Sequence, residues 1–391
     1  MVLAIVSTAL AGTKYRVVHA FGMGHDGGGL WGSLALDAKG NLYGTTSGGG
    51  TYGDGTVFEL SPTSNGTWAE TILHSFPSFS DDGGGPMSTP IVDSTGNLYA
   101  TTEGGGGPYS YGTVFELRPG SGNWIETIIH RFNRGELGSP MGPLIMSASG
   151  KLYGIAHDPF ELSPDDGRWN ITLLHHFPSY KGDGLGAYQG VILDAAGNVY
   201  GVTEGGGTGK SDICIQTGCG TAYKLHRMSN RKWKETILHD FGTGDDMAIP
   251  GGLLQDGSGN FYGAADGGAQ LQGVIYKLSR DSSGHWKTTI QYSFTGGVNG
   301  GGPNSSLIMD KAGNLYGVTA AGGTAQCGCG VVYKLAPRSS GNWKYTVLHR
   351  FSGADGAQPS ASLTLDSKGN LYGTTATGGA GGAGVAFEIT P

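Results

Sequence analysis

The chain repeats one unit seven times, and this repetition constrains its fold more than any other feature. In each unit a tyrosine stands in a G-N-L-Y-G context or a close relative, roughly 45–64 residues from the next one. The seven tyrosines are Tyr43, Tyr99, Tyr153, Tyr200, Tyr262, Tyr316 and Tyr372. A G-T-V-F-E-L segment or a relative follows the tyrosine, and six units end in a W-x-x-T-I-L-H-x-F segment or a relative. Repetition at this period indicates copies of one supersecondary unit packed side by side.

Each unit carries the signals of four β-strands. In the first unit, segments 33–37 and 41–46 are separated by three residues, which is typical of a hairpin. The G-T-V-F-E-L segment is rich in β-branched and aromatic residues, and the last segment alternates apolar and polar residues. No segment shows a sustained 3.6-residue apolar period, so helix content should be very low. The sequence therefore predicts an all-β fold, a seven-bladed β-propeller of four-stranded blades.

The two ends of the chain are predicted to complete one blade together. The segment Lys14–Phe21, KYRVVHAF, matches the fourth strand of a unit but precedes the first complete unit, and the last unit stops at FEITP after its third strand. We expect the N-terminal strand to complete the seventh blade, which closes the ring and removes a free sheet edge. Residues 14–391 are thus predicted to form a single propeller, and residues 1–13 to be a remnant of a signal peptide or an apolar lead strand.

Composition and charge exclude several classes of partner. Glycine accounts for 76 of 391 residues, and Gly48–Gly53 satisfies the G-x-G-x-x-G spacing of dinucleotide-binding loops. That motif requires a following helix, whereas a strand follows here, so we interpret these glycines as turn residues that permit positive φ. The net charge of −7 argues against nucleic acid, and no apolar run reaches the ~18 residues that membrane insertion requires.

The order of the markers carries a family resemblance. GNLYGTT, GGG, GTVFEL and a trailing ILHSF recur from Lys14 to the C-terminus and resemble the GloVer tandem-repeat proteins, which are exported bacterial proteins. The third unit departs from the pattern, since it lacks the GGG…GTV portion. More loosely, D-x-x-G-N-L-Y resembles the blade motif of NHL and virginiamycin-lyase-like propellers. The resemblance implies a repeat fold and a secreted or cell-surface location, but no particular activity.

The markers themselves are interpreted as structural. A His or Trp that recurs at one strand position in nearly every unit serves its own blade, the His by a hydrogen bond or edge packing and the Trp by packing, although a row of Trp side chains can also bind sugars. The Asp of D-x-x-G-N is predicted to cap the hairpin turn.

Four cysteines lie in two loops that are two units apart. Cys214 and Cys219 flank IQTG, and Cys327 and Cys329 lie in QCGCG. Three pairings are open, and local disulfides within each loop are favoured, although the ring closed by Cys327 and Cys329 would be small. A zinc site is the alternative, but two pairs on separate blades would have to converge on one tetrahedron. Disulfides would agree with export.

Function is expected where the second-to-third and fourth-to-first connections meet, because these connections vary between units. The residue four positions after the marker tyrosine should face the mouth of the central channel. The seven residues there are Ser47, Glu103, His157, Glu204, Asp266, Ala320 and Ala376. We predict a notch over the third unit, with Glu103, His157 and Glu204 as catalytic candidates. The ligand-binding candidates are Asp158, Asp266, Asp81, Asp82 and Arg134. The alternative interpretation is a set of solvated loop residues.

Two classes of function remain open at this point. The first is a secreted or cell-surface propeller that binds an extracellular glycan or protein through its loops, because no strong catalytic motif is present. The second is an extracellular glycoside hydrolase or polysaccharide lyase, with Glu103 and Glu204 as the carboxylate pair and His157 as acid or base. No cofactor is expected other than Ca²⁺, which the acidic loops could bind.

Overall fold

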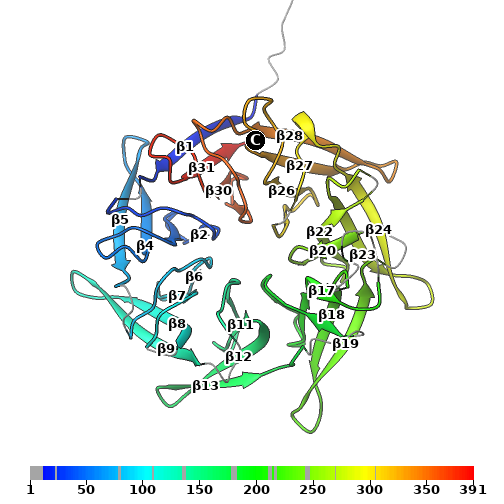
Figure 1. The fold of residues 1–391 in the computed structure, drawn as a ribbon, viewed down its shortest axis with the longest axis horizontal. Helices are drawn as coiled ribbons and strands as arrows, with labels where there is room; N and C mark the ends of the chain where they lie inside the picture. Colours follow the sequence, from blue (N-terminus) through cyan, green and yellow to red (C-terminus); the bar gives the residue numbers. More distant parts are fainter. Residues whose placement is uncertain are drawn as a thin grey trace, which may run out of the picture.

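The computed structural model is a ring of seven antiparallel blades around a central axis (Figure 1). The structure describes residues 12–22, 24–77, 81–107, 110–133, 138–177, 183–209, 214, 218–242, 247–268, 270–303 and 305–391. Among these residues a three-residue 3₁₀ turn, Gly297–Asn299, is the one helical element, and no helix has the length and apolarity that a membrane crossing requires. The predicted all-β seven-bladed propeller is confirmed.

The blades follow one another along the chain, and each one runs from a short inner strand to a longer outer strand (Figure 1). The first six comprise β2 (Ala35–Leu36), β3 (Leu42–Thr46), β4 (Thr56–Pro62) and β5 (Trp68–Ser75); β6 (Ile91–Val92), β7 (Leu98–Thr102), β8 (Ser110–Pro119) and β9 (Trp124–Asn133); β10 (Ile145–Met146), β11 (Leu152–Ala156), β12 (Asp158–Asp165) and β13 (Arg168–Leu173); β15 (Ile192–Leu193), β16 (Val199–Val202), β18 (Thr221–Arg227) and β19 (Trp233–Asp240); β21 (Leu254–Gln255), β22 (Phe261–Gly267), β23 (Val274–Arg280) and β24 (Trp286–Ser293); and β25 (Ile308–Met309), β26 (Leu315–Thr319), β27 (Val331–Pro337) and β28 (Trp343–Arg350). Three short strands, β14 (Gly184–Leu185), β17 (Gly205–Gly206) and β20 (Met247–Pro250), tie connections to one another or to a blade on the loop face.

The seventh blade is built from both ends of the chain, as predicted. It comprises β29 (Thr364–Leu365), β30 (Leu371–Thr375), β31 (Val385–Thr390) and β1 (Lys14–Ala20). Strand β1 pairs antiparallel with β31 along its length, from Lys14 opposite Thr390 to Ala20 opposite Val385. The Arg16 guanidinium also donates to the Glu388 carboxylate with an Nε–O distance of 2.9 Å. The ring is therefore closed by noncovalent contacts of the outermost strand.

The repeated turn between the first two strands of a blade is capped by its aspartate. The Asp37 carboxylate accepts the backbone N–H groups of Lys39 and Asn41, both at 2.8 Å. Equivalent bonds are made by Asp93, Asp194, Asp256, Asp310 and Asp366. This pattern confirms the predicted role of the D-x-x-G-N motif, an Asx turn that fixes the hairpin.

The glycine-rich loop after β3 is a turn and not a nucleotide cradle. Gly49 and Gly50 have φ angles of 79° and 78°, a region that other L-residues rarely adopt, and the loop leads directly into β4. Gly44 within β3 has a different role, because a Cβ atom there would lie 2.4 Å from Cζ of Phe58. Strand glycine thus makes room for the aromatic side chain of the next strand.

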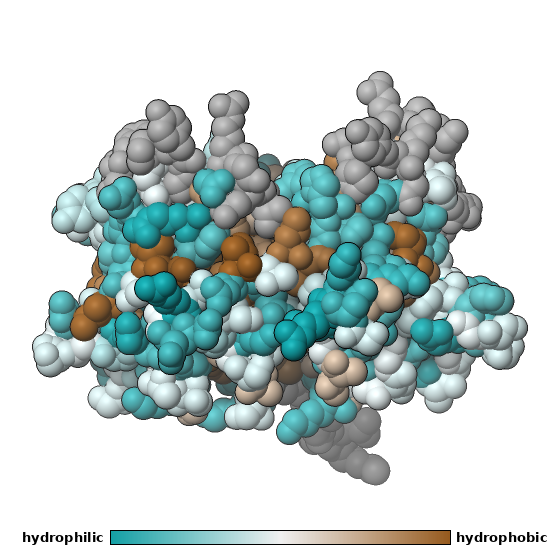
Figure 2. Space-filling model, turned by 90° about the horizontal axis from the view of Figure 1, so that it is seen from below, coloured by the Kyte–Doolittle hydropathy of each residue, from teal (hydrophilic) through white to brown (hydrophobic). Residues whose placement is uncertain are grey.

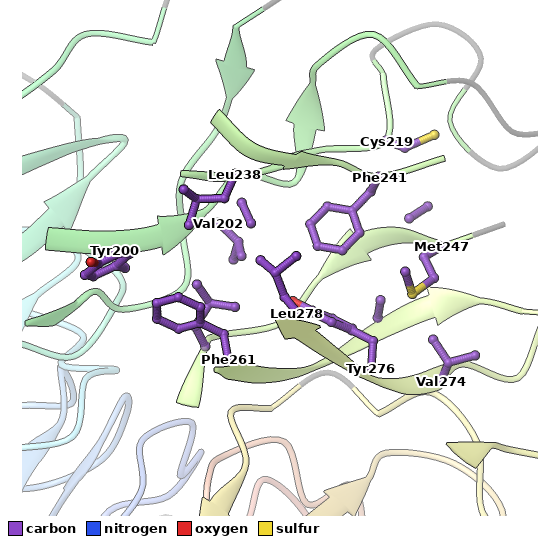
Figure 3. Close-up of a cluster of buried hydrophobic side chains, with 14 of the residues drawn as sticks. Tyr200, Val202, Cys219, Leu238, Phe241, Met247, Phe261, Val274, Tyr276 and Leu278 are labelled. Carbon is purple, nitrogen blue, oxygen red and sulfur yellow. The ribbon is translucent and has the colours of Figure 1, made fainter. Parts of the chain in front are cut away.

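Neighbouring blades pack against each other through the marker residues. The Trp124 ring meets the Tyr43 ring of the preceding blade edge-on, with a centroid distance of 6.5 Å. The same contact joins Trp68 to Tyr372, Trp169 to Tyr99 and Trp343 to Tyr262. The hydrophobic clusters also span blade boundaries, and in Figure 3 side chains of the fourth and fifth blades interdigitate in one core. The interpretation of the marker tryptophans as packing residues agrees with these contacts.

Seen from its side, the disc carries small separate hydrophobic patches among polar side chains (Figure 2). Scattered apolar residues of this kind are normal for a protein surface, whereas a docking face for another protein is usually a larger contiguous patch. The side shown in Figure 2 therefore lacks the usual signature of a protein interface among the residues that the structure describes.

We expect deletion of residues 12–20 to lower the free energy of unfolding by ~3–5 kcal/mol, because β31 loses a strand of hydrogen bonds and the seventh blade loses its outer packing. A circular permutant in which residues 12–20 follow Pro391 through a short turn should recover the loss, because it restores the same strand pair as a hairpin. Denaturant unfolding of both proteins checks this, with a chain that begins at Gly12 as the control. An unchanged unfolding midpoint in the deletion variant would show that the closure contributes nothing.

Candidate functional site

A pocket of about 770 Å³ opens at the mouth of the central channel, on the face that carries the variable connections. All seven blades contribute to it, mainly through the end of the connection that leads into each first strand. Its members by blade are Trp31, Met87, Met141, Tyr188, Ile249, Ser305 and Ser360. A pocket of this size that lies on the axis and draws on every blade is the best candidate for a ligand site.

One arc of the pocket wall carries the large apolar side chains, beside the polar residues Ser33, Ser88, Thr89 and Gln189. It runs over the first five blades through Trp31, Met87, Met141, Tyr188 and Ile249. The Trp31 and Tyr188 side chains are large and well exposed, at 46% and 37% of their full surface. Exposed aromatic rings on the wall of a pocket offer flat apolar faces to a ligand, with a polar atom at the edge of each ring.

The opposite arc is made of serines on the sixth and seventh blades. Ser305, Ser306, Ser360 and Ser362 line it. Ser305 is only 5% exposed, and the hydroxyl groups of Ser305 and Ser360 have no hydrogen-bond partner among the residues that the structure describes. A buried hydroxyl without a partner costs free energy, and rotation of either serine side chain toward the cavity would let a ligand supply the missing bond.

Two carboxylates lie on the same blades as Tyr188 and Ile249. Glu204 follows β16 on the fourth blade, Asp266 belongs to β22 on the fifth blade, and both line the pocket. Burial raises the pKa of Glu204, and the negative charge of Asp266 raises it further. Burial also raises the pKa of Asp266. The two acids are thus close enough for the charge of one to affect the other, and burial disfavours the ionised form of both.

The other predicted site residues that the structure describes do not line this pocket. Glu103, His157 and Asp158 are not among the residues that line the pocket, although the His157 ring meets the pocket residue Tyr188 edge-on at 6.3 Å. Arg134 lies outside the described residues. Asp81 accepts the Arg131 guanidinium with its backbone oxygen at 3.0 Å, and Asp82 belongs to a contact between blades that is described below.

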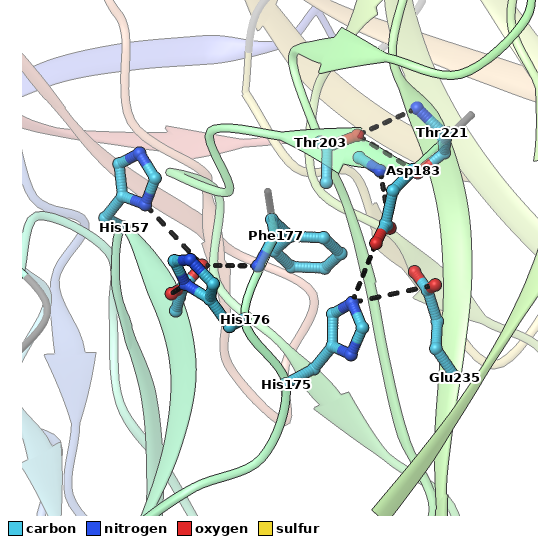
Figure 4. Close-up of polar contacts among 10 residues, drawn as sticks. His157, His175, His176, Phe177, Asp183, Thr203, Thr221 and Glu235 are labelled. Atoms are coloured by element: carbon cyan, nitrogen blue, oxygen red, sulfur yellow. Dashed lines mark hydrogen bonds and ion pairs between the residues drawn. The ribbon is translucent and has the colours of Figure 1, made fainter. Parts of the chain in front are cut away.

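Asp158 has a structural task that follows from the missing loop of the third blade. In four complete blades and at the closure of the ring, the Phe after the fourth strand donates its N–H to a glycine carbonyl just before the third strand, as Phe76 does to Gly55 at 3.0 Å. The third blade lacks this glycine, and Phe177 donates to the Asp158 carboxylate instead, also at 3.0 Å (Figure 4). Asp158 is 1% exposed, and its other oxygen lies 2.5 Å from Nδ1 of His176. The side chain therefore replaces a backbone acceptor.

His157 forms the connection between β11 and β12 alone, and its φ of 66° lies in the left-handed region. Histidine is one of the residues that tolerate this conformation. Its Nδ1 lies 3.5 Å from the Asp158 carboxylate. The sequence correctly marked this unit as altered, and the alteration explains the buried acid.

Both local disulfides favoured from the sequence are confirmed. Cys214 is bonded to Cys219 and Cys327 to Cys329, with Cα–Cα distances of 5.1 Å in both. No cysteine of the chain is left free. A cysteine zinc site is therefore excluded in this state of the protein.

The marker histidines join one blade to the next. Nε2 of His74 on β5 lies 3.1 Å from the Asp82 carboxylate and 3.7 Å from the Glu126 carboxylate on β9 of the following blade. Two equivalent clusters are His19, Asp26 and Glu70, and His175, Asp183 and Glu235 (Figure 4). Burial raises the pKa of Glu70 to about 7, and the charge of Asp26 adds to the shift.

These clusters are better explained as joints than as metal sites. Their donor atoms lie within 4.8 Å of one another, close enough to share one ion. At two other blade boundaries, however, the same position is filled by stacked rings, Tyr292 on Tyr345 at 4.3 Å and His349 on Tyr15 at 3.7 Å. A Ca²⁺ ion takes roughly six to eight oxygen ligands, and none of the three clusters offers such a set among the described residues.

Comparison with known proteins supports the repeat and the fold. Residues 214–391 match the sequence profile of the Gloeobacter/Verrucomicrobia repeat. This match confirms, over that part of the chain, the resemblance carried by the markers. A comparison of the sequence with curated proteins returns no match.

Solved structures share the propeller architecture at low identity. Two structures of the extracellular domain of BT4673 from B. thetaiotaomicron, described as a one-component and as a hybrid two-component system, match 93% of this chain with TM-scores of 0.54 and 0.55 and identities of 12% and 13%. This chain spans 40% of their length. The gluconolactonase XC5397 from Xanthomonas campestris is also similar, with a TM-score of 0.42 and 12% identity over 77% of this chain and 84% of its own. At such identities the likeness to the two BT4673 structures shows the fold alone.

We expect the Glu70 carboxyl to make stability depend on pH. Its pKa rises from 4.5 to about 7 on folding, so the folded state binds more protons in this interval. The stabilisation is full below pH 4.5 and is lost as the pH rises to about 7, with a loss of up to ~3 kcal/mol at ~1.4 kcal/mol per pKa unit. Denaturant unfolding at several pH values checks this. Between these pH values the free energy of unfolding of Glu70→Gln should change less with pH than that of the wild type, whereas the control Glu103→Gln should show the same change as the wild type. Parallel curves for Glu70→Gln and the wild type would refute the joint as a proton-binding contact.

Proposed function

We propose that this propeller binds a carbohydrate in the mouth of its central channel, and that it does so outside the cell. The observation that carries the proposal is the division of the pocket wall into an aromatic and apolar arc and an arc of serines with unpartnered hydroxyls. A sugar ring has the matching surface, because its C–H faces pack on aromatic rings while its hydroxyls need hydrogen-bond partners.

The two arcs of the pocket wall would contact different groups of the sugar. Trp31 and Tyr188 would each stack on a different sugar ring of the ligand, since both side chains are exposed in the wall and belong to the first and fourth blades. The hydroxyls of Ser305 and Ser360 would bond to hydroxyls of the sugar. The volume of about 770 Å³ lies within the range of small-molecule sites, large enough for a short oligosaccharide or the end of a longer chain.

An extracellular location is supported by the two disulfides, which persist in oxidising compartments and are rare in the cytosol. A protein ligand is the less favoured partner, because the candidate site is a concave pocket of about 770 Å³, a size typical of small-molecule sites.

A carbohydrate-active enzyme is the second candidate, favoured by one specific observation. Glu204 and Asp266 are two carboxylates from adjacent blades in one pocket, and the charge of Asp266 raises the pKa of Glu204. A carboxyl with a raised pKa can act as the general acid beside an ionised partner. This pair replaces Glu103 and His157 as the catalytic candidates, because those two do not line the pocket.

A glycan array followed by calorimetry of the bound glycans tests the proposal. We expect Trp31→Ala and Tyr188→Ala each to weaken binding by about 10-fold or more, because each removes a stacking surface worth ~1.4 kcal/mol or more. Tyr111→Ala is the matched control, an exposed tyrosine of β8 that does not line the pocket. Release of reducing ends that Glu204→Gln abolishes would establish the enzyme instead. Binding that survives both aromatic variants, or an array without any bound glycan, would exclude a sugar site at the channel mouth.

A further inference from the structure

The two carboxylates of the pocket have no positive partner. Glu204 and Asp266 take part in no salt bridge among the described residues, and the residues that line the pocket include no Lys, Arg or His. At the blade joints, by contrast, the carboxylates of each cluster lie beside a histidine. Unlike the carboxylates at the joints, Glu204 and Asp266 thus present uncompensated negative charge to an open cavity.

The position of this pair fits an organic cation better than a metal ion. The two carboxylates lie on the fourth and fifth blades, with Tyr188 and Ile249 of the apolar arc on the same blades and Ser305 on the next blade. A protonated amine can accept this arrangement, because it is small, donates up to three hydrogen bonds and is attracted to aromatic faces. Two half-buried carboxylates and an aromatic wall do not supply the set of roughly six to eight oxygens that Ca²⁺ takes.

We propose that the ligand carries a protonated primary amine, as an unacetylated amino sugar does, and that Glu204 and Asp266 bind this ammonium group. The inference rests on the proposed function and specifies the class of sugar. The sugar ring that carries the amine stacks on Tyr188, the ammonium group lies between the two carboxylates, and hydroxyls of the ligand bond to Ser305 and Ser360. The raised pKa values of both acids agree with the assignment, because the repulsion that raises the pKa of Glu204 is relieved by a bound cation.

Three tetrasaccharides that differ at one substituent provide the test. The β-1,4-linked oligomers of glucosamine, N-acetylglucosamine and glucose share backbone and ring shape, and only the first carries an ammonium group. Calorimetry below neutral pH should show the glucosamine oligomer binding about 10-fold or more tightly than the other two, because a charge-assisted bond to a carboxylate is about twice as strong as a neutral one.

The variants separate this inference from the proposed function. The double variant E204Q/D266N should bind the glucosamine oligomer no better than the glucose oligomer, whereas the control D165N/D166N removes two exposed acids outside the pocket lining and should keep the preference. Equal binding of all three oligomers, lost in Trp31→Ala, would overturn the amine and leave the sugar site intact. A preference for the acetylated oligomer would also overturn it. Absence of binding by all three would overturn both proposals.

Discussion

The contact between one blade and the next is the interaction on which the rest of the structure depends. A four-stranded sheet with one long outer strand buries little on its own, so each blade gains its stability from two neighbours. The sequence places two kinds of contact residue at the joints, a Trp that meets the Tyr of the preceding blade at four boundaries and a fourth-strand ring or charge that meets the next outer strand at five. A ring of such joints has no stable end, which is why β1 must return to β31 and close it.

This requirement explains both what the repeats keep and what they change. The joint tolerates different chemistry as long as the two sides match, since His74 with Glu126 and Tyr292 with Tyr345 occupy the same position at different boundaries. The third blade shows the same tolerance in a loop, because Asp158 supplies the acceptor that a glycine carbonyl supplies elsewhere. Loops on the channel face are free of these constraints, and the differences between units accumulate there.

The fold could be predicted from the sequence because the repeated marker residues are the ones that make the contacts between blades. Tyr43 and its equivalents reveal the period of the repeat. The fourth-strand motif at Lys14–Phe21, which precedes the first complete unit, reveals how the ring closes. The two carboxylates of the pocket could also be predicted, since Glu204 and Asp266 came from aligning the units on their tyrosines. The rest was missed because a channel mouth takes one residue from each blade, and periodicity alone does not show which position faces the axis.

An alignment of the units on the aspartate of the D-x-x-G-N turn would have identified further residues of the pocket. Trp31, Met87 and Tyr188 stand six residues before the aspartate of the turn or its equivalent, and Ser360 holds that position on the seventh blade. The change from large apolar side chains to serine around the ring is readable in the sequence, but only once this position is known to line the mouth. His157 and Asp158 are a different case, because this pair was a site candidate in the sequence, and in the structure Asp158 bonds to His176 and Phe177 of its own unit.

The same residue types therefore serve two purposes in this protein, and their partners distinguish them. A half-buried glutamate with a raised pKa occurs both at the joints and in the pocket. At the joints it recurs with a histidine and an aspartate, so its protonation stabilises the ring. In the pocket the carboxylates occur on two adjacent blades only, beside unpartnered hydroxyls and exposed rings. In a repeat protein, a perturbed acid that breaks the repeat and lacks an internal partner is the one that points to a ligand.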